Sequence, residues 1–463
     1  MTADRSPLAT EIRATFTVAA PLAAANLAQM AMHVTNAVMV GHLGAVSLAA
    51  AGLGAALYAT LLMTSQGVLT AVAPLAAHAI GADDHPTAGG VAGAGLIVAA
   101  LLAAPVIAIL TAFPLLLAGL GYDPELVAGI GLYLRAISWG APAFLGIAVL
   151  RFLLVAAFRA RVVMVISLIA VPLNAALNWM LIFGHFGVPG LGILGSACAT
   201  AIVQWLTLLG FAGYLLLTPT RIPVSIGRIV LREIPRILRL GLPIGALRGL
   251  EIGLFVTTGI LMGLLGADAL GAHQLVFNVA GVCFMVPLGL GQAATVRVAF
   301  QLGLGAPAAA RRAGFVALAL GAAFMAAMAV LLLAAPRTLI GFYLDLGDAA
   351  NRGLVEIALR LFFIAALFQV FDGVQVIAVG ALRGYADTAV PMLIAAIGYW
   401  VIGFAGGCVL AFPLGYGAVG LWSGLALGLA VVATLLTLRL QSRARAHMRG
   451  ARAMSLVTNG LRA

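Results

Sequence analysis

Long apolar segments follow one another along the whole chain, separated by short stretches rich in glycine, proline and charged residues. Each reaches the roughly 20 residues that an α-helix needs to cross a hydrocarbon core about 30 Å thick. The alternation of apolar and polar residues that membrane β-strands show over about ten positions is not seen. The pattern therefore predicts an all-α integral membrane protein. Twelve transmembrane helices are expected, near residues 15–41, 47–79, 89–113, 126–150, 160–184, 191–216, 237–265, 270–302, 312–335, 353–382, 388–412 and 416–438.

The composition supports this class. Of 463 residues, 63% are hydrophobic and 8% are charged, against roughly 25% charged in soluble domains. The net charge of +11 comes from arginines that lie mostly at span ends, which favours a role in topology over binding of nucleic acid. Cys198, Cys283 and Cys408 lie in apolar segments without a CxxC spacing, so we expect packing residues rather than disulfides or metal ligands. The first apolar run follows Arg5 and Arg13 and is longer than a signal-peptide core, so we expect it to be retained as a span.

Arginines mark alternate connections between the expected spans. They cluster before the first span, after the fourth, eighth and tenth, in the link 217–236 and in the C-terminal tail. The intervening connections instead carry Asp123, Glu125, Asp268, Asp345 and Asp348. Because cytoplasmic connections of membrane proteins are enriched in basic residues, the pattern predicts that both termini are cytoplasmic.

Four short matches in the same order indicate an internal repeat. Residues 40–45 resemble 262–267, 80–81 resemble 302–303, 158–159 resemble 382–383, and 192–195 resemble 417–420. The spacing is nearly constant, from 222 (262 − 40) to 225 (417 − 192). We therefore expect two six-helix lobes, 1–216 and 237–438, with an inter-lobe linker at 217–236 and a basic cytoplasmic tail at 439–463. Since six is even, both lobes start on the same side, and such parallel pseudo-two-fold repeats are typical of transporters.

Glu251 and Asp372 are acids deep inside apolar segments. Glu251 lies about 18 Å along a helix from Arg239, and Asp372 about 16 Å from Arg383. A carboxylate at that depth costs at least about 2.5 to 3.5 kcal/mol, so it marks a functional hypothesis by default. Protons and a bound cation would compete for such a group, which makes the pair the expected ion-coupling site and the candidate sodium ligands. A structural ion pair is the alternative.

Arg248 precedes Glu251 by one helical turn and shares its helix face. Pairing of the two side chains would give the arginine a structural or tuning role. It could instead recognise an anionic substrate or steady Asp372. Arg151, at the end of the fourth span, is expected to extend towards the cytoplasmic surface.

Uncharged polar side chains in the spans are candidates for a substrate cavity. In the first half they share helix faces at spacings of three and four residues, and in the second half they lie in spans eight and ten. Hydrogen bonding between helices is the structural alternative. The candidates are His33, Asn36, Asn174, Asn178, Gln274, Asn278 and Gln375, together with Arg248.

Motifs of other protein classes are missing from the sequence. A chain without lysine cannot contain the phosphate-binding loop GxxxxGK followed by serine or threonine, so ATP-driven transport by this subunit is not expected. HExxH, GxSxG and clusters of histidine and cysteine do not occur either, so no enzyme and no cofactor are expected. Gly420, Gly424 and Gly428 are spaced four apart, which permits close helix contact.

The sequence resembles the multidrug and toxic compound extrusion (MATE) family, in its NorM-like bacterial branch, over nearly the whole chain. In the first half the resemblance rests on residues 36–44, on Pro172-Leu173-Asn174 and on Asn178-Trp179. In the second half it rests on Gly241-Leu242-Pro243, Glu251, residues 272–274 with Asn278, Asp372 to Gln375 and residues 382–385. Residues 272–274 with Asn278, and the run from Asp372 on to Tyr385, resemble the family most specifically.

The resemblance implies twelve helices in two lobes of a monomer in the bacterial cytoplasmic (inner) membrane. It further implies proton or sodium influx that drives export of organic, cationic or amphiphilic small molecules by alternating access, with coupling acids at Glu251 and Asp372. The chain departs from the pattern at Asn36, where relatives commonly carry an aspartate, and at Arg248, where an apolar residue is expected. Both changes make the cavity less acidic, which weakens the prediction of cationic substrates more than that of antiport.

Two other functions stay open at this point. A flippase of lipid-linked anionic oligosaccharide would use Arg248 for a phosphate, but it would need a cavity dominated by arginines. A channel or passive pore would conduct continuously, whereas paired acids in a two-lobe repeat favour alternating access.

Overall fold

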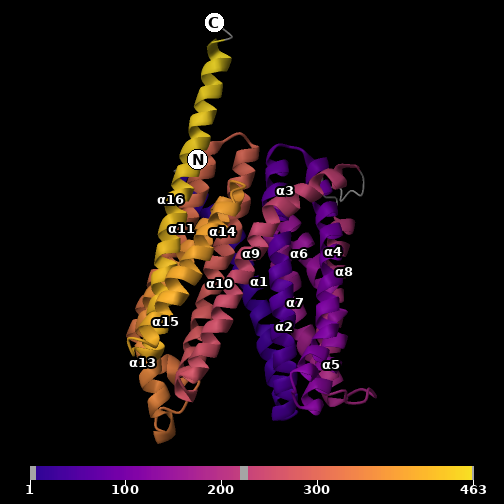
Figure 1. Ribbon diagram of the computed structural model, residues 1–463. Helices are drawn as coiled ribbons and strands as arrows, with labels where there is room; N and C mark the ends of the chain where they lie inside the picture. Colours follow the sequence, from indigo (N-terminus) through magenta and orange to yellow (C-terminus); the bar gives the residue numbers. More distant parts are fainter. Residues whose placement is uncertain (1–6, 219–227, 461–463) are drawn as a thin grey trace, which may run out of the picture. The chain divides into compact units, whose positions relative to one another are not determined.

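The computed structural model describes residues 7–218 and 228–460, and every regular element within them is a helix (Figure 1). The predicted all-α fold is confirmed. The first eight helices are α1 (Pro7–Gly41), α2 (Ala45–Leu69), α3 (Val72–Gly81), α4 (His85–Gly119), α5 (Pro124–Ser138), α6 (Ala141–Ala156), α7 (Ala160–Phe183) and α8 (Ile193–Leu217). They are followed by α9 (Arg228–Leu264), α10 (Ala267–Gly303), α11 (Pro307–Ala334), α12 (Pro336–Gly341), the 3-10 turn η1 (Ala349–Asn351), α13 (Arg352–Gly384), α14 (Ala389–Ala396), the π-helical segment η2 (Ile397–Ala405), α15 (Gly406–Ala411) and α16 (Gly417–Gly460).

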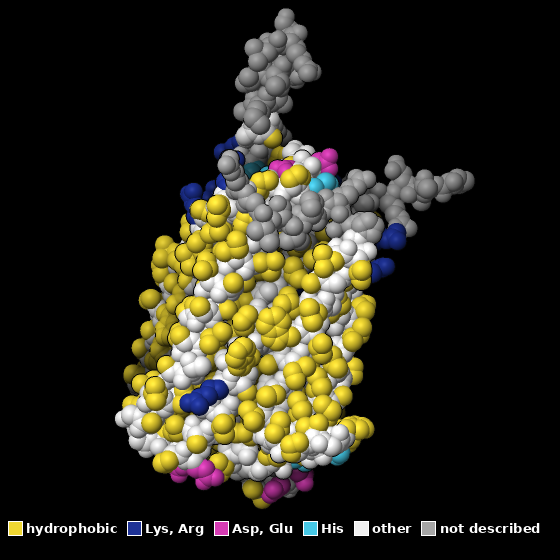
Figure 2. Space-filling view, turned by 90° about the vertical axis from the view of Figure 1, so that its right-hand side faces the viewer, with side chains coloured by type: hydrophobic (Ala, Val, Ile, Leu, Met, Phe, Trp, Pro, Cys, Tyr) yellow, Lys and Arg dark blue, Asp and Glu magenta, His cyan; other side chains and the backbone are white. Residues whose placement is uncertain are grey.

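These helices account for the twelve expected spans. Ten stretches of the described residues are long and apolar enough to cross a membrane, and α5 with α6 makes an eleventh, bent by 42°. The 35-residue helix α1 is equally long but less apolar, because it carries Asn26, Gln29, His33 and Asn36. With α1 the number is twelve. Figure 2 shows hydrophobic side chains over most of one face, with charged ones mainly towards its ends, as a surface in contact with lipid requires.

The chain forms two compact units. The N-terminal unit comprises Ala24–Gly245, and the C-terminal unit comprises Met1–Ala23 with Ala246–Ala463. In the first, α2, α4, α5, α6 and α8 pack together, and in the second, α10, α11, α13 and α16 do so. Part of the expected linker 217–236, residues 219–227 with Arg221, lies outside the described residues, as do Arg5 and residues 461–463. Residues 228–236 begin α9, and the expected tail continues α16 to Gly460.

The boundaries between the units fall inside α1 and α9, two residues after a proline in each helix. Pro21 and Pro243 are these prolines, and they are separated by the repeat spacing of 222 (243 − 21). A proline inside a helix removes one backbone hydrogen bond and bends the helix. Each of the two helices therefore contributes its first part to one unit and its second part to the other.

The first parts of α1 and α9 pack in equivalent ways. In the C-terminal unit, a Cβ on Gly289 would lie 2.9 Å from the backbone of Ala19 and Ala23. In the N-terminal unit, a Cβ on Gly67 would lie 2.7 Å from the Cα of Gly245. Gly67 and Gly289 are again 222 residues apart. Glycine at both places lets the two backbones touch, which is how helices associate closely in lipid.

Backbone conformation supports the repeat at three of its four matches. Gly44 and Gly266 precede α2 and α10 with φ of 100° and 121°, and Gly192 and Gly417 precede α8 and α16 with φ of 55° and 53°. Positive φ favours glycine, which has no Cβ to clash. The turns after 80–81 and 302–303 also correspond, because the amides of Asp84 and Ala306 bond the carbonyls five residues earlier.

The remaining sequence match, of 158–159 with 382–383, is wrong by one helical turn. In the structure, Phe158 with φ of 58° corresponds to Ala386 with φ of 57°, at a spacing of 228 (386 − 158). The amides that follow them, on Arg159 and Asp387, bond the carbonyls of Leu154 and Leu382. Leu382 and Arg383 lie one helical turn before Ala386 and Asp387, and their similarity to Phe158 and Arg159 produced the apparent match.

Candidate functional site

The C-terminal unit places Arg248 and Glu251 in direct contact on α9. An Nη1–H of Arg248 donates to Oε2 of Glu251 at 2.7 Å. The two residues are three apart, so the helix aligns them on one face. The Glu251 side chain is 15% exposed, and that of Arg248 is 32% exposed. The pairing considered from the sequence is thus present.

Asp372 lies on α13 of the same unit and is buried. Its Oδ1 accepts a hydrogen bond from Nε2 of Gln375, one turn along the helix, at 3.4 Å. Gln369, one turn earlier, is also buried, and neither polar atom of its side chain has a hydrogen-bond partner among the described residues. Asp372 therefore has an amide as its recorded partner and lacks the direct guanidinium contact that Glu251 has.

Coulomb interactions link the two acids with two arginines. Asp372 interacts with both Glu251 and Arg248, and Arg383 and Tyr399 interact with members of the same group. Two ionised carboxylates and two guanidinium groups would have no net charge. One proton or one metal cation added to this group would therefore leave an unbalanced positive charge, and charge imbalance in a low dielectric is costly.

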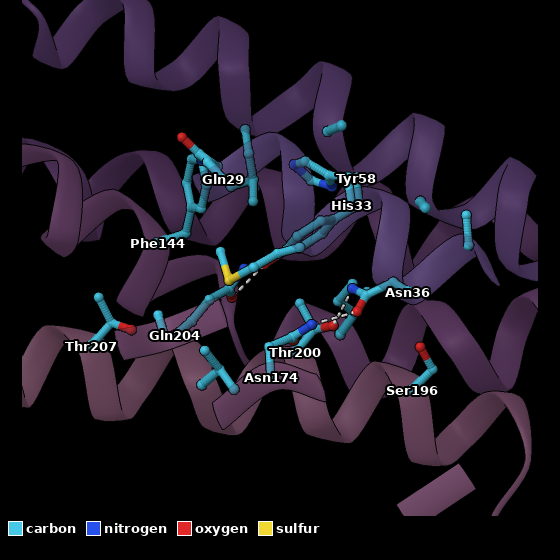
Figure 3. A pocket seen from close by; sticks show the side chains of 18 of the residues that line it. Gln29, His33, Asn36, Tyr58, Phe144, Asn174, Ser196, Thr200, Gln204 and Thr207 are labelled. Atoms are coloured by element: carbon cyan, nitrogen blue, oxygen red, sulfur yellow. Dashed lines mark hydrogen bonds between the residues drawn. The ribbon is translucent and has the colours of Figure 1, made fainter. Parts of the chain in front are cut away.

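In the N-terminal unit, three of the predicted asparagines form one hydrogen-bond network. Oδ1 of Asn36 accepts from Nδ2 of Asn174 at 2.6 Å and from Nδ2 of Asn178 at 3.0 Å. Nδ2 of Asn36 donates to Oγ1 of Thr200 at 3.1 Å. The network joins α1, α7 and α8, and Figure 3 shows Asn36, Asn174 and Thr200 connected in this way. Thr200 was not among the residues predicted from the sequence.

The network forms part of the wall of a cavity of about 210 Å³, all of whose lining residues belong to the N-terminal unit. His33 also lines this cavity, and Figure 3 shows it with Gln29 and Phe144. Much of the remaining wall is apolar, as is usual for sites that bind organic molecules. No aspartate or glutamate is among the described side chains that line it.

A second polar pair in the cavity depends on a glycine at the bend between α5 and α6. The hydroxyl of Tyr58 donates to Oε1 of Gln204 at 2.8 Å (Figure 3). A Cβ on Gly140 would overlap Oε1 of Gln204 and would lie 3.1 Å from the Tyr58 hydroxyl. Glycine is needed here for space, because its φ of −78° is open to any residue.

Arg151 corrects one expectation from the sequence. It does not extend to the surface: it is 8% exposed and lines the cavity. An Nη2–H donates to Oδ1 of Asn26 on α1. Among the described residues, no carboxylate lies within ion-pair distance of Arg151, in contrast to the six arginine–carboxylate pairs that the structure records elsewhere.

Gln274 and Asn278, the other predicted polar residues, lie neither in the cavity nor in the group of charges around Glu251 and Asp372. Gln274 and Asn278 are exposed on α10, and the side chain of Asn278 bonds the backbone oxygen of Gln274 at 2.9 Å. Their neighbour His273 is buried and accepts a hydrogen bond from Nε1 of Trp422 at 3.2 Å. His273 thus belongs to an aromatic cluster with Phe277, Phe368 and Trp422, which indicates a packing role.

The repeat relates the two sites to each other. At the spacing of 222, Glu251 corresponds to Gln29, and Arg248 corresponds to Asn26. At the spacing of 228 found for α6 and α13, Asp372 corresponds to Phe144. Gln29 and Phe144 both line the cavity. Equivalent positions therefore carry acids in the C-terminal unit and neutral side chains in the N-terminal unit.

A helical membrane protein with two parallel repeats, ionisable groups in one and a polar-lined cavity in the other, has the organisation of a secondary transporter. The comparisons with known proteins agree. The model of the MatE family matches residues 21–180 and 243–409, and the chain belongs to this family, which confirms the resemblance seen in the sequence.

Relatives match over almost their full length. The chain is 46% identical to a probable multidrug resistance protein NorM of Burkholderia mallei, over 93% of this chain and 92% of that protein. It is 40% identical to one of Pseudomonas aeruginosa, over 94% and 90%. The fold is similar to that of the eukaryotic MATE transporter AtDTX14, with a TM-score of 0.85 at 21% identity, over 96% of this chain and 99% of that one. These relatives are named as transporters or resistance proteins, so the chain belongs with transporters and not with enzymes.

Proposed function

We propose that the protein is a multidrug efflux antiporter that couples the entry of a proton or a sodium ion to the export of organic amphiphiles. The observation that carries the proposal is the group of charges that includes the buried Asp372 and the Arg248–Glu251 pair inside apolar helices, in a chain of the MatE family. The names of the relatives support multidrug efflux. Because these relatives are bacterial, they also support a location of this protein in the bacterial cytoplasmic membrane.

Glu251 and Asp372 are the proposed coupling site. The two carboxylates can each take up a proton, and their oxygens, together with the amide oxygens of Gln369 and Gln375, are hard ligands that suit sodium. Among the described residues there is no group of three or more acidic, histidine or cysteine side chains that could hold a metal, so a sodium ion would depend on these neutral oxygens as well. Arg248 already occupies one carboxylate oxygen of Glu251, and an incoming cation would compete with it.

Ion binding changes which conformation is favoured. When the group around Glu251 and Asp372 binds a cation, its charge rises by one, and the conformation that best solvates or shields that charge becomes more populated. One elementary charge crossing a potential of about 150 mV releases roughly 3.5 kcal/mol, which supports a substrate gradient of several hundredfold. One or two ions per cycle would therefore be sufficient.

The test is reconstitution of the purified protein into liposomes with an imposed pH gradient or sodium gradient. Movement of cationic, zwitterionic, anionic and neutral compounds is then measured, with an ionophore that collapses each gradient as the control. The proposal expects organic substrate to move against its gradient only while one of the two ion gradients is present. A steady electrical current that needs no substrate would contradict antiport and favour a pore.

A further inference from the structure

We propose, on the basis of the proposed efflux function, that Arg151 makes the cavity of the N-terminal unit a receptor for substrates that carry a carboxylate or another anionic group. The favoured substrates are then zwitterions or organic anions with an apolar body, rather than simple monocations. Figure 3 labels polar side chains that line this cavity, among them Gln29, Asn174 and Thr207.

The first support is the missing counter-charge. Arg151 is 8% exposed, and its recorded partner is the neutral side chain of Asn26. Its Nε has no hydrogen-bond partner among the described residues. A guanidinium group carries five N–H donors in a planar fork that suits two carboxylate oxygens. The group therefore keeps donors and a full positive charge for a ligand.

The second support is the contrast between the repeated units. In the C-terminal unit, Arg248 is paired with Glu251 at 2.7 Å. The equivalent positions in the N-terminal unit are Asn26 and Gln29, so the acid is replaced by an amide. An arginine is present here as well, but it comes from α6 and, unlike Arg248, it is buried. Arg151 is thus a buried cation with no carboxylate at ion-pair distance among the described residues, and an unpaired buried charge is costly unless a ligand neutralises it.

The third support is the composition of the cavity wall. Besides Arg151, the described lining includes amide and hydroxyl groups such as Gln29, Gln66, Asn174 and Thr207 and many apolar side chains, but no carboxylate. A monocation would enter a cavity whose fixed charge repels it. A molecule with a carboxylate at one end and an apolar body would instead gain a charge-assisted hydrogen bond and apolar contacts together.

The experiment measures equilibrium binding to the purified full-length protein in detergent by fluorescence polarisation. The two probes are a rhodamine dye with a free carboxylate and the methyl ester of the same dye, which is a monocation. The variants are Arg151→Gln, which removes the charge, and Arg151→Lys, which retains it. Arg161→Gln is the matched control, because Arg161 is an exposed arginine at the start of α7 and does not line the cavity.

The wild type is expected to bind the acid dye more tightly than the ester. Arg151→Gln should weaken binding of the acid dye by about tenfold or more and should not weaken binding of the ester. Arg151→Lys should retain part of the affinity for the acid, and Arg161→Gln should match the wild type. Equal loss for both dyes in Arg151→Gln, or unchanged binding of the acid, would overturn the proposal.

Two further outcomes are decisive. If Arg151→Gln does not fold, the wild type still decides, because tighter binding of the ester than of the acid, or no binding of the acid, would overturn the proposal. Since binding needs no gradient, the result is separate from transport. The protein could bind the carboxylate dye in a way that depends on Arg151 and yet transport neither dye when an ion gradient is imposed. That result would support the receptor and contradict the proposed efflux function.

Discussion

The guanidinium of Arg248 donates to the carboxylate of Glu251 across one turn of α9, at 2.7 Å. Asp372 lies in the same electrostatic group but takes its hydrogen bond from an amide. The two acids therefore differ in what a coupling ion must displace. At Glu251 it competes with an internal cation, and at Asp372 it competes with the N–H of Gln375.

Replacing Arg248 by glutamine should strengthen ion binding. The loss of a cation in contact with Glu251 is expected to improve the affinity for a second cation by roughly tenfold or more. The half-maximal rate of ion-driven transport would then occur at about tenfold lower sodium concentration, or at about one unit higher pH if the ion is a proton. The measurement is the ion dependence of transport in proteoliposomes.

The control for this variant is Arg360→Gln. Arg360 pairs with Glu356 at 2.6 Å, but both side chains are about two-thirds exposed, and exposed pairs contribute little. It should leave the ion dependence as in the wild type. An Arg248→Gln protein with the wild-type ion dependence would show that the pair is structural.

Replacing Asn36 by aspartate should make the cavity more attractive to cations. The new carboxylate can accept the hydrogen bonds of Asn174 and Asn178, and the hydroxyl of Thr200 can rotate to donate to it, so the network is preserved. We expect monocationic dyes to bind about tenfold more tightly, with no change for an uncharged dye of similar size. Equilibrium dye binding measures this. Equal affinities of the wild type and the Asn36→Asp variant for the cationic dye would show that Asn36 does not influence substrate binding in the cavity.

Gly140→Ala should destabilise the N-terminal unit. The added Cβ overlaps Oε1 of Gln204 and crowds the Tyr58 hydroxyl, so the flexible Gln204 side chain has to move away and give up its hydrogen bond with Tyr58. A buried hydroxyl left without its partner typically costs about 1 to 3 kcal/mol. Thermal unfolding in detergent should therefore begin at lower temperature. Gly213→Ala is the matched control on α8, since a Cβ there meets no atom within 4 Å. A Gly140→Ala protein as stable as this control would mean that the bend adjusts freely.

The sequence predicted the spans and the repeat because both rest on local patterns. A run of apolar residues is visible wherever it occurs, and glycines such as Gly44 and Gly266 recur because each turn needs a positive φ. The match of 158–159 with 382–383 failed because two residues are too few to fix a helical register. The exchange of the first parts of α1 and α9 between the units could not be predicted, since it depends on which backbones meet at Gly67 and Gly289.

The candidate site was predicted in part. The pairing of Arg248 with Glu251, and the helix face that Asn174 and Asn178 share, follow from helical spacing. Hydrogen bonding between helices, which joins Asn36 to them, was the structural alternative for these polar residues. Arg151 was misplaced because its position near a helix end is compatible with both the surface and the interior. Only packing against α1 decides that it reaches Asn26. Thr200 and Gln204 were missed because single polar residues in apolar helices give no signal until their partners are known.

The most direct test of the account separates coupling from substrate movement in the double variant Glu251→Gln with Asp372→Asn. Proteoliposomes are loaded with substrate, and two rates are compared: exchange of labelled for unlabelled substrate without any ion gradient, and accumulation against a substrate gradient with an ion gradient imposed. The account predicts that exchange persists while the accumulation ratio falls to about one, because no ion can be bound. Accumulation to the wild-type ratio by the double variant would contradict it.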